Sequence, residues 1–287
     1  MTRFRHLVVI TGATRGLGRL VADRFRAAGD DLVLVARHKS DLAKTAEEFS
    51  CGTHKHQRIH YFAADLADLD GIPKLIAEIR INAGDPDILI NNAAVQGPIG
   101  PVHTNNWNEW QFCLNVCLLA PVRLCQGLLP GMIKNGYGRI VNISGGGATA
   151  PRPNFSSYAT AKCGLVRFSE TLAQEVRDCG ITVNCVAPGA MSSNLTQNII
   201  SAGKEYAGSA EFESALNLTT DNPHTENRAA DLVHFLTTDT CATISGKLVS
   251  AVWDPWEKLP DAAPALTNRD VYTLRRIVPE DRNLKIG

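Results

Sequence analysis

The sequence lacks a charge excess of either sign and any long apolar run. Its 287 residues include 29 Lys and Arg against 29 Asp and Glu. Proteins that hold phosphate backbones or anionic lipid need a basic excess. A membrane helix needs roughly 18 to 20 predominantly apolar residues in succession, and no uninterrupted run approaches that length. We therefore expect a cytoplasmic protein with no nucleic acid and no membrane among its partners.

Paired cysteines are also missing. The eight cysteines are scattered and form no CxxC pair, which is typical of reduced thiols in a cytosolic protein. Only Cys51, His54, His56 and His60 lie close enough in sequence to suggest a zinc site. Structural zinc sites usually draw on two well-spaced ligand pairs, so we interpret this segment as a polar surface loop and predict no metal.

The sequence does contain short β-branched runs that alternate with helix-period segments. The expected strands are 7–10, 32–35, 59–62, 88–90, 139–143, 182–186 and 247–249. The expected helices are 17–28, 41–49, 72–81, 109–134, 158–178 and 227–238. Most strands are apolar throughout, as when helices cover both faces of a parallel sheet. The prediction is a single α/β domain with a doubly wound, Rossmann-type sheet of about seven strands.

Two segments fall outside this alternation. Residues 190–224 are rich in Ser, Asn, Thr and Gly and follow the sixth expected strand. Because open α/β sheets bind ligands beyond the carboxyl ends of their strands, we expect a substrate lid there. The main domain is expected to span 1–250. The C-terminal extension 251–287 is expected to wrap over a neighbouring surface or a partner subunit.

A glycine-rich loop follows the first expected strand and leads into a helix. It comprises Thr11, Gly12, Ala13, Thr14, Arg15, Gly16, Leu17 and Gly18. Glycines in this context let the backbone approach a pyrophosphate, and the helix N-terminus presents free N–H groups to the phosphates. The loop therefore predicts a dinucleotide site.

The residues after the second expected strand bear on which dinucleotide binds. An acidic residue there would bond the ribose 2′-OH, whereas this strand ends in Ala36 and Arg37. Arg37 and Arg15 offer cationic donors suited to a 2′-phosphate. The prediction is NADP(H) in preference to NAD(H), and the alternative is that both arginines are solvated surface charge.

Tyr158 and Lys162 are four residues apart at the start of an expected helix, which puts both side chains on one face. Tyrosine has a pKa of about 10, so a nearby positive charge is needed to stabilise its phenolate near neutral pH. Lys162 can supply that charge. The alternative is an exposed pair without chemistry.

These features, taken in order along residues 5–250, resemble the compact branch of the short-chain dehydrogenase/reductase family. The resemblance is carried by the glycine loop, Arg37, Tyr158 and Lys162, and by a second group of residues between and after them. That group is Asp65, Leu66, Asn91, Asn92, Ala93, Ala94, Asn115, Pro188 and Gly189.

The resemblance implies roles for these residues. Asp65 would contact the adenine, and Leu66 beside it would also bind the cofactor. Asn92 and Ala93 would border the cofactor, and Pro188, Gly189 and Ser193 would hold its carboxamide side. Ala94 stands where the family usually has Gly. Asn115 would anchor the water of a proton relay. Tyr158 would be the general acid/base, and Lys162 would bind the nicotinamide ribose and lower the pKa of Tyr158. A homodimer or homotetramer built through 109–134 and 158–178 is also implied.

One member of the pattern is out of place. Gly145 occupies the position of the family's catalytic serine, and the nearest hydroxyl belongs to Ser144. Three outcomes stay open: Ser144 is displaced into the site, Thr149 or a backbone N–H polarises the substrate oxygen, or reductase chemistry is weak or absent. A glycine-rich loop can absorb a one-residue shift through its free dihedral angles.

The sequence therefore favours an NADP(H)-dependent oxidoreductase that interconverts a carbonyl and a secondary alcohol. The polar lid indicates a small, polar substrate. One alternative is a nucleotide-sugar epimerase or dehydratase with a recycled cofactor, although the short chain and glycine spacing count against it. The other alternative, prompted by Gly145, is a catalytically weak cofactor-binding subunit.

Overall fold

A computed structural model describes residues 5–52, 54–218, 223–267 and 269–284. Its described part contains a seven-stranded parallel sheet in the order β3-β2-β1-β4-β5-β6-β7. The strands are β1 Leu7–Thr11, β2 Asp31–Ala36, β3 Ile59–Ala63, β4 Ile88–Asn91, β5 Gly138–Ile143, β6 Ile181–Ala187 and β7 Leu248–Ser250. The predicted fold class is confirmed, and each predicted strand lies at its expected place.

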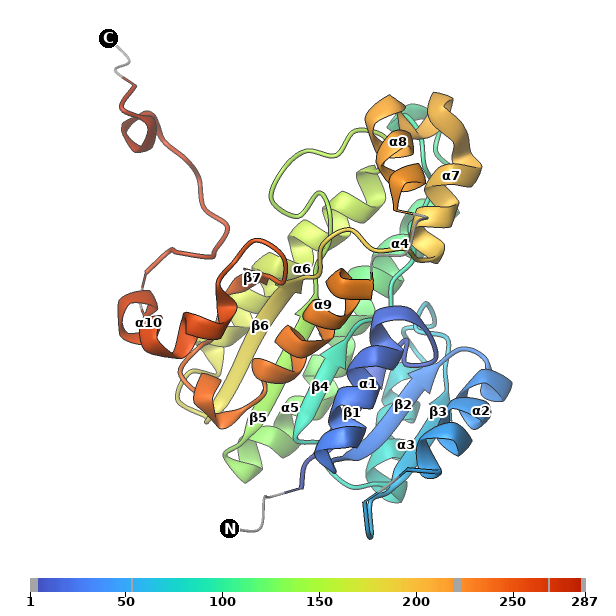
Figure 1. Cartoon of the computed structure of the whole chain (residues 1–287), viewed down its shortest axis with the longest axis vertical. Helices are drawn as coiled ribbons and strands as arrows, with labels where there is room; N and C mark the ends of the chain where they lie inside the picture. Colours follow the sequence, from blue (N-terminus) through green and yellow to red (C-terminus); the bar gives the residue numbers. More distant parts are fainter. Residues whose placement is uncertain (1–4, 53, 219–222, 268, 285–287) are drawn as a thin grey trace.

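Helices cover both faces of this sheet (Figure 1). One face carries α1 Gly16–Ala28, α2 Lys39–Ser50 and α9 Pro223–Phe235, and the other carries α3 Ile72–Asn82, α5 Ala120–Asn135 and α6 Ser156–Glu175. Successive residues of a strand point to opposite faces, so Val8 and Ile10 join one core cluster while Leu7 and Val9 join the other. This two-sided burial explains why the central strands are mostly apolar.

The predicted helix 109–134 is one continuous helical run with a change of pitch. It consists of α4 Trp107–Leu114, the π-helical turn η2 Asn115–Leu119, and α5. By length and composition, Trp107–Asn135 could cross a membrane. Its apolar side instead packs against the sheet through Leu124, Leu128 and Met132, which are at most 1% exposed. We therefore describe it as a core helix.

The expected lid contains two helices, α7 Asn194–Ala207 and α8 Ser209–Asn217, which stand beyond the carboxyl ends of the strands (Figure 1). Phe155, Ile199, Ala207 and Ala215 form a small apolar cluster that joins these helices to the segment before α6. Part of the expected lid, residues 219–222, lies outside the described residues.

The first part of the C-terminal extension packs on its own chain. The short helix η4 Trp256–Lys258 and helix α10 Leu259–Leu266 bury Trp256, Leu259 and Leu266 in the core cluster of α1 and α9. Farther on, Leu248 N donates to Tyr272 O at 2.8 Å. The end of the described chain, with η5 Pro279–Arg282, projects from the body (Figure 1).

Two further short helices lie elsewhere in the chain, η1 Val102–Thr104 and η3 Asp239–Cys241.

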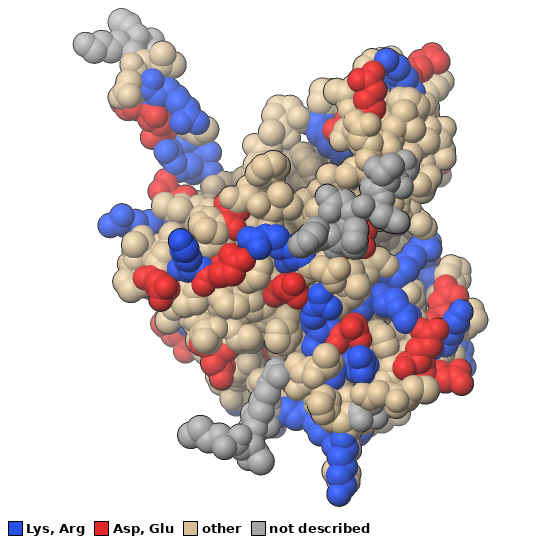
Figure 2. Space-filling view, in the orientation of Figure 1, with Lys and Arg blue, Asp and Glu red and all other residues tan. Residues whose placement is uncertain are grey.

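Charges on the face shown in Figure 2 are mixed, with acidic and basic side chains interspersed over the helices. This arrangement fits the equal numbers of acidic and basic residues in the sequence. The predictions that nucleic acid and membrane are not partners stay predictions.

Candidate active site

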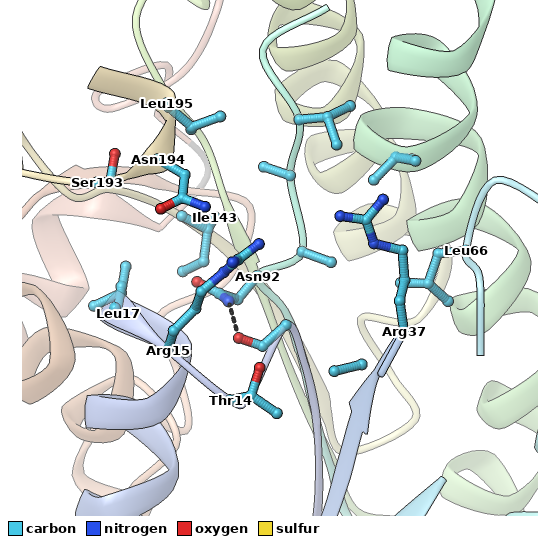
Figure 3. Close-up of a pocket in the computed structure, with 18 of the residues that line it drawn as sticks. Thr14, Arg15, Leu17, Arg37, Leu66, Asn92, Ile143, Ser193, Asn194 and Leu195 are labelled. Carbon is cyan, nitrogen blue, oxygen red and sulfur yellow. Dashed lines mark hydrogen bonds between the residues drawn. The ribbon is translucent and has the colours of Figure 1, made fainter. Parts of the chain in front are cut away.

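A cavity of about 390 Å³ lies at the carboxyl ends of the central strands, where the strand order reverses between β1 and β4 (Figure 3). Most of the predicted site residues line it. These are Gly12, Thr14, Arg15, Gly16, Leu17, Gly18, Arg37, Asp65, Leu66, Asn92, Ala93, Ser144, Tyr158, Lys162, Pro188 and Ser193. The fold thus brings residues from nearly two hundred positions of sequence to one edge of the sheet.

Close packing explains the glycines of the loop after β1. Gly12 has φ +66, and a side chain there would begin 2.9 Å from Asn92 Nδ2. A side chain at Gly18 would overlap the Gly12 carbonyl oxygen. Asn92 Nδ2 donates to Thr11 O at 2.9 Å, which ties the loop to the end of β4. Gly16, with φ +49, has open space where a side chain would begin. The loop is therefore fixed at both ends and open at its middle.

The N-terminus of α1 opens into this space. Its N-cap residue is Arg15, which makes no side-chain cap, and its first turn holds no acidic residue. The first N–H groups of a helix lack partners within the helix and carry the positive end of its dipole. Together with the open position at Gly16, this end of the cavity fits a pyrophosphate.

Arg15 and Arg37 extend into the cavity from two different elements (Figure 3). Both are exposed, and neither guanidinium makes a hydrogen bond or ion pair with any residue in the described part of the chain. Sequence reasoning missed Asp41, a carboxylate from the first turn of α2 that also borders this end. Asp65 accepts a hydrogen bond from Ala67 N at 3.0 Å, so one of its oxygens caps a turn.

Tyr158 and Lys162 lie at the opposite end of the cavity, on the first two turns of α6. Both are buried, with exposed fractions of 6% and 1%. Lys162 Nζ donates to Ile143 O at 2.7 Å and lies 5.5 Å from the centre of the Tyr158 ring. The spacing of four residues therefore places the phenol and the ammonium together, as predicted.

Burial is the largest influence on the phenol and raises the pKa of Tyr158. The neighbouring thiol of Cys117 acts in the same direction, whereas the guanidinium of Arg152 lowers the pKa. The sequence assigned this lowering to Lys162, whose ammonium is held by the Ile143 carbonyl. Sequence reasoning missed Arg152 because it lies in the loop before α6 and outside the YxxxK pattern.

Gly145 faces the hydroxyl of Tyr158. A side chain at Gly145 would begin 2.5 Å from Tyr158 Oη and 3.1 Å from its Cε1. Ser144 lines the cavity, is 2% exposed, and has no hydrogen-bond partner for its hydroxyl among the described residues. Thr149 is exposed and is not among the residues that line the cavity. Ser144 therefore supplies a buried hydroxyl, unpartnered among the described residues, to the cavity, whereas Gly145 is the position at which a side chain would meet the Tyr158 hydroxyl.

Two predicted site residues lie outside the cavity lining. Asn115 begins the π-helical turn, and its Nδ2 donates to Ala67 O at 3.3 Å. Gly189 packs against Val252, whose side chain a Cβ would meet at 2.6 Å. Ser193, which does line the cavity, caps α7 by accepting from Thr196 N at 3.4 Å.

The segment 190–224 contributes further lining residues. Met191, Asn194 and Leu195 border the cavity, as do Phe112 and Val116 from the α4 run. The sequence placed Phe112 and Val116 within the expected helix 109–134 and gave them no role, because nothing in a helical pattern tells a cavity wall from a packed interface.

Known proteins of one family are similar to this chain in sequence and fold. The model of the short chain dehydrogenase family matches residues 6–204. D-beta-hydroxybutyrate dehydrogenase of Rhizobium meliloti (strain 1021) is 30% identical over 248 residues, which cover 84% of this chain and 95% of that relative.

Two solved structures are similar over 86% of this chain. One is L-sorbose reductase from Gluconobacter frateurii complexed with NADPH and L-sorbose, with TM-score 0.74, 28% identity and 94% of that chain covered. The other is a variant of actinorhodin polyketide ketoreductase with NADPH, with TM-score 0.76, 25% identity and 95% of that chain covered. With the fold and these matches together, the chain belongs to the short-chain dehydrogenase family and is an oxidoreductase acting between CH–OH and C=O.

Proposed function

We propose that this protein is an NADP(H)-dependent oxidoreductase that interconverts a carbonyl and a secondary alcohol on a small, polar substrate. One observation carries the proposal: a single cavity joins an anion-binding loop at one end to Tyr158 and Lys162 at the other.

Features of the cofactor end support the proposed preference for NADP(H) over NAD(H). The open backbone around Gly16 and the α1 N-terminus would hold the pyrophosphate. Arg15 and Arg37 would donate to a 2′-phosphate, since guanidinium groups suit phosphate geometry. The NADPH complexes of the two similar structures support this choice. When bound, the nicotinamide supplies or accepts the hydride.

The catalytic end supplies the proton. Tyr158 donates a proton to the substrate oxygen during reduction and accepts it during oxidation. Lys162 would bind the nicotinamide ribose, and Asn115 would anchor the water that returns the proton. Ser144, whose hydroxyl is buried without a partner among the described residues, is the side chain that would polarise the substrate oxygen.

The lid supports a hydroxyl-rich substrate. Ser192, Ser193 and Asn194 line the cavity from this segment. The structurally similar L-sorbose reductase binds a small sugar. A panel of ketoses and other polar carbonyl compounds is therefore the first choice of substrates.

The test measures consumption of NADPH and NADH by absorbance with that panel. We expect turnover with NADPH, and loss of at least about 10²-fold in kcat/KM in Tyr158→Phe. Tyr61→Phe is the matched control, because Tyr61 is 36% exposed on β3, away from the cavity lining. No net change in cofactor, with product formed, would indicate an epimerase instead.

Gly145 favours a second candidate, which is a cofactor-binding subunit with weak catalysis. The position that faces the Tyr158 hydroxyl carries a glycine in place of the serine expected for the family. NADPH binding measured by calorimetry, with no turnover on any carbonyl and no effect of Tyr158→Phe, would support this candidate and overturn the oxidoreductase proposal.

A further inference from the structure

The loop between β5 and α6 carries a cation beside the proposed acid/base. Arg152 stands between Pro151 and Pro153, whose rings restrict the backbone of this segment. Its guanidinium carbon lies 4.0 Å from the centre of the Phe155 ring and 5.7 Å from the centre of the Tyr158 ring. The guanidinium is thus held close to the Tyr158 ring through its contact with the Phe155 ring.

The glycine stretch at 145–147 borders both the guanidinium and the phenol. A Cβ at Gly146 would lie 3.6 Å from Cδ, Nε and Cζ of Arg152, in ordinary contact. Gly145 presents no side chain toward Tyr158. The glycine stretch that replaces the family's serine is therefore the same stretch against which the guanidinium packs.

The lid contributes the counter-charge. Glu211 of α8 accepts two hydrogen bonds from Arg152, from Nε at 2.9 Å and from Nη2 at 2.8 Å. The two side chains are 15% and 35% exposed. The third nitrogen, Nη1, makes no hydrogen bond within the described ranges of the chain. Glu211 therefore fixes the guanidinium and partly offsets its charge.

Other ionisable groups face Tyr158 from the elements around it. Cys113 and Cys117 approach from α4 and η2, and both raise the pKa of Tyr158. Lys162 approaches from α6, with its ammonium bonded to Ile143 O. Arg152 from the loop is the group that acts in the opposite direction to the thiols.

We propose that Arg152 is a positioning residue that stabilises the ionised form of Tyr158, and that Glu211 on the lid tunes this effect by offsetting the charge. The inference rests on the proposed role of Tyr158. It also links the lid to proton transfer, since movement of α8 away from the loop would remove the counter-charge and favour the phenolate.

The test compares the pH profiles of kcat/KM for Arg152→Gln and Glu211→Gln. A single charge near the phenol shifts its titration by about one unit in a partly buried site. Arg152→Gln removes a positive charge, so the apparent pKa of Tyr158 should rise by about that amount. Glu211→Gln removes the offsetting negative charge, so the apparent pKa should fall.

A matched control lies on the same helix. Glu213 pairs with Lys204 at 2.9 Å, and their side chains are 61% and 56% exposed. Glu213→Gln removes the same charge from α8 and should leave the pH profile unchanged. Arg152→Lys, which keeps the charge, should shift the profile less than Arg152→Gln does. Thermal unfolding of each variant checks that it folds.

The proposal requires the apparent pKa of Tyr158 to shift in opposite directions in Arg152→Gln and Glu211→Gln. If Arg152 and Glu211 only tie the lid to the loop, both variants break the same ion pair and should change activity alike. Shifts in the same direction, or no shift in either variant, would overturn the proposal.

A second measurement separates this inference from the proposed function. The Tyr158 phenolate can be titrated directly by ultraviolet difference absorbance, with Tyr158→Phe protein as the blank. Absence of turnover in the unmodified protein would refute the proposed function, while the titration would still give the direction of each shift. Unchanged titration in Arg152→Gln would refute the role of Arg152 even in an active enzyme.

Discussion

The close approach of Gly145 to the Tyr158 hydroxyl gives a sharp prediction for Gly145→Ala. The added Cβ would begin 2.5 Å from Oη, 3.1 Å from Cε1 and 3.1 Å from Cζ. Tyr158 is only 6% exposed, so it has little room to move away. Forcing a methyl group into a packed site costs about 1–3 kcal/mol of stability. A displacement of a catalytic group by about 1 Å can cost about 10²-fold in kcat/KM.

Gly146→Ala is the matched control. Its added Cβ would meet Arg152 at 3.6 Å, which is ordinary contact. Neither Gly145 nor Gly146 has a positive φ, so neither substitution strains the backbone. Replacing glycine by alanine also restricts the unfolded chain by a similar amount at both positions. The difference between the two variants therefore isolates the contact with Tyr158.

The assay combines urea unfolding with kcat/KM from NADPH absorbance. We expect Gly145→Ala to be less stable and much less active than Gly146→Ala. Equal stability and activity in the two variants would show that Tyr158 is not held against Gly145. A rise in kcat/KM in Gly145→Ser would also refute the reasoning, because the serine would then find space beside the phenol.

Four further predictions concern the cofactor, the pH profile, the C-terminal segment and assembly. Arg37→Ala should raise KM for NADPH by about 10- to 100-fold, because a hydrogen bond to a charged group contributes about 1.5–3 kcal/mol. The same variant should leave KM for NADH nearly unchanged in steady-state assays. Because burial raises the pKa of Tyr158, the phenol stays protonated at neutral pH. Carbonyl reduction should therefore keep its rate between about pH 6 and 9, whereas alcohol oxidation should accelerate as pH rises; a fall in reduction across this range would contradict the shift. Trp256→Ala should lower the free energy of unfolding by about 3–5 kcal/mol, since Trp256 is 7% exposed, whereas Trp253→Ala at 85% exposure should change it little. Sedimentation should show a homodimer or homotetramer, and a monomer at assay concentrations would contradict the assembly through 109–134 and 158–178.

Several features of this protein follow from the sequence because their cause is local. The central strands β1, β2 and β4 are apolar runs, and a strand buried on both faces needs nothing else to be recognised. The glycine loop can be recognised from its spacing directly after the first strand, although its close packing against Asn92 comes from a residue about 80 positions away. Tyr158 and Lys162 share a face because helical periodicity alone sets that relation.

Other features depend on residues that are distant in sequence. Arg152 and Glu211 are separated by 59 positions and meet only because α8 folds back over the loop before α6. Trp256 lies beyond the predicted domain of 1–250 yet packs against Phe235, with ring centres 5.3 Å apart. Neither contact leaves a periodic signal in the chain.

At the catalytic end, the sequence and the tertiary structure each account for different features. From the sequence, the family resemblance placed Gly145 at the position of the family's serine, with Ser144 as the neighbouring hydroxyl. Only the tertiary structure decided that Gly145 is the residue facing the Tyr158 hydroxyl and that a guanidinium lies over the Tyr158 ring. The reason is physical: sequence spacing fixes which face of a helix or strand a residue occupies, whereas the path of a glycine-rich loop is set by the side chains that pack around it.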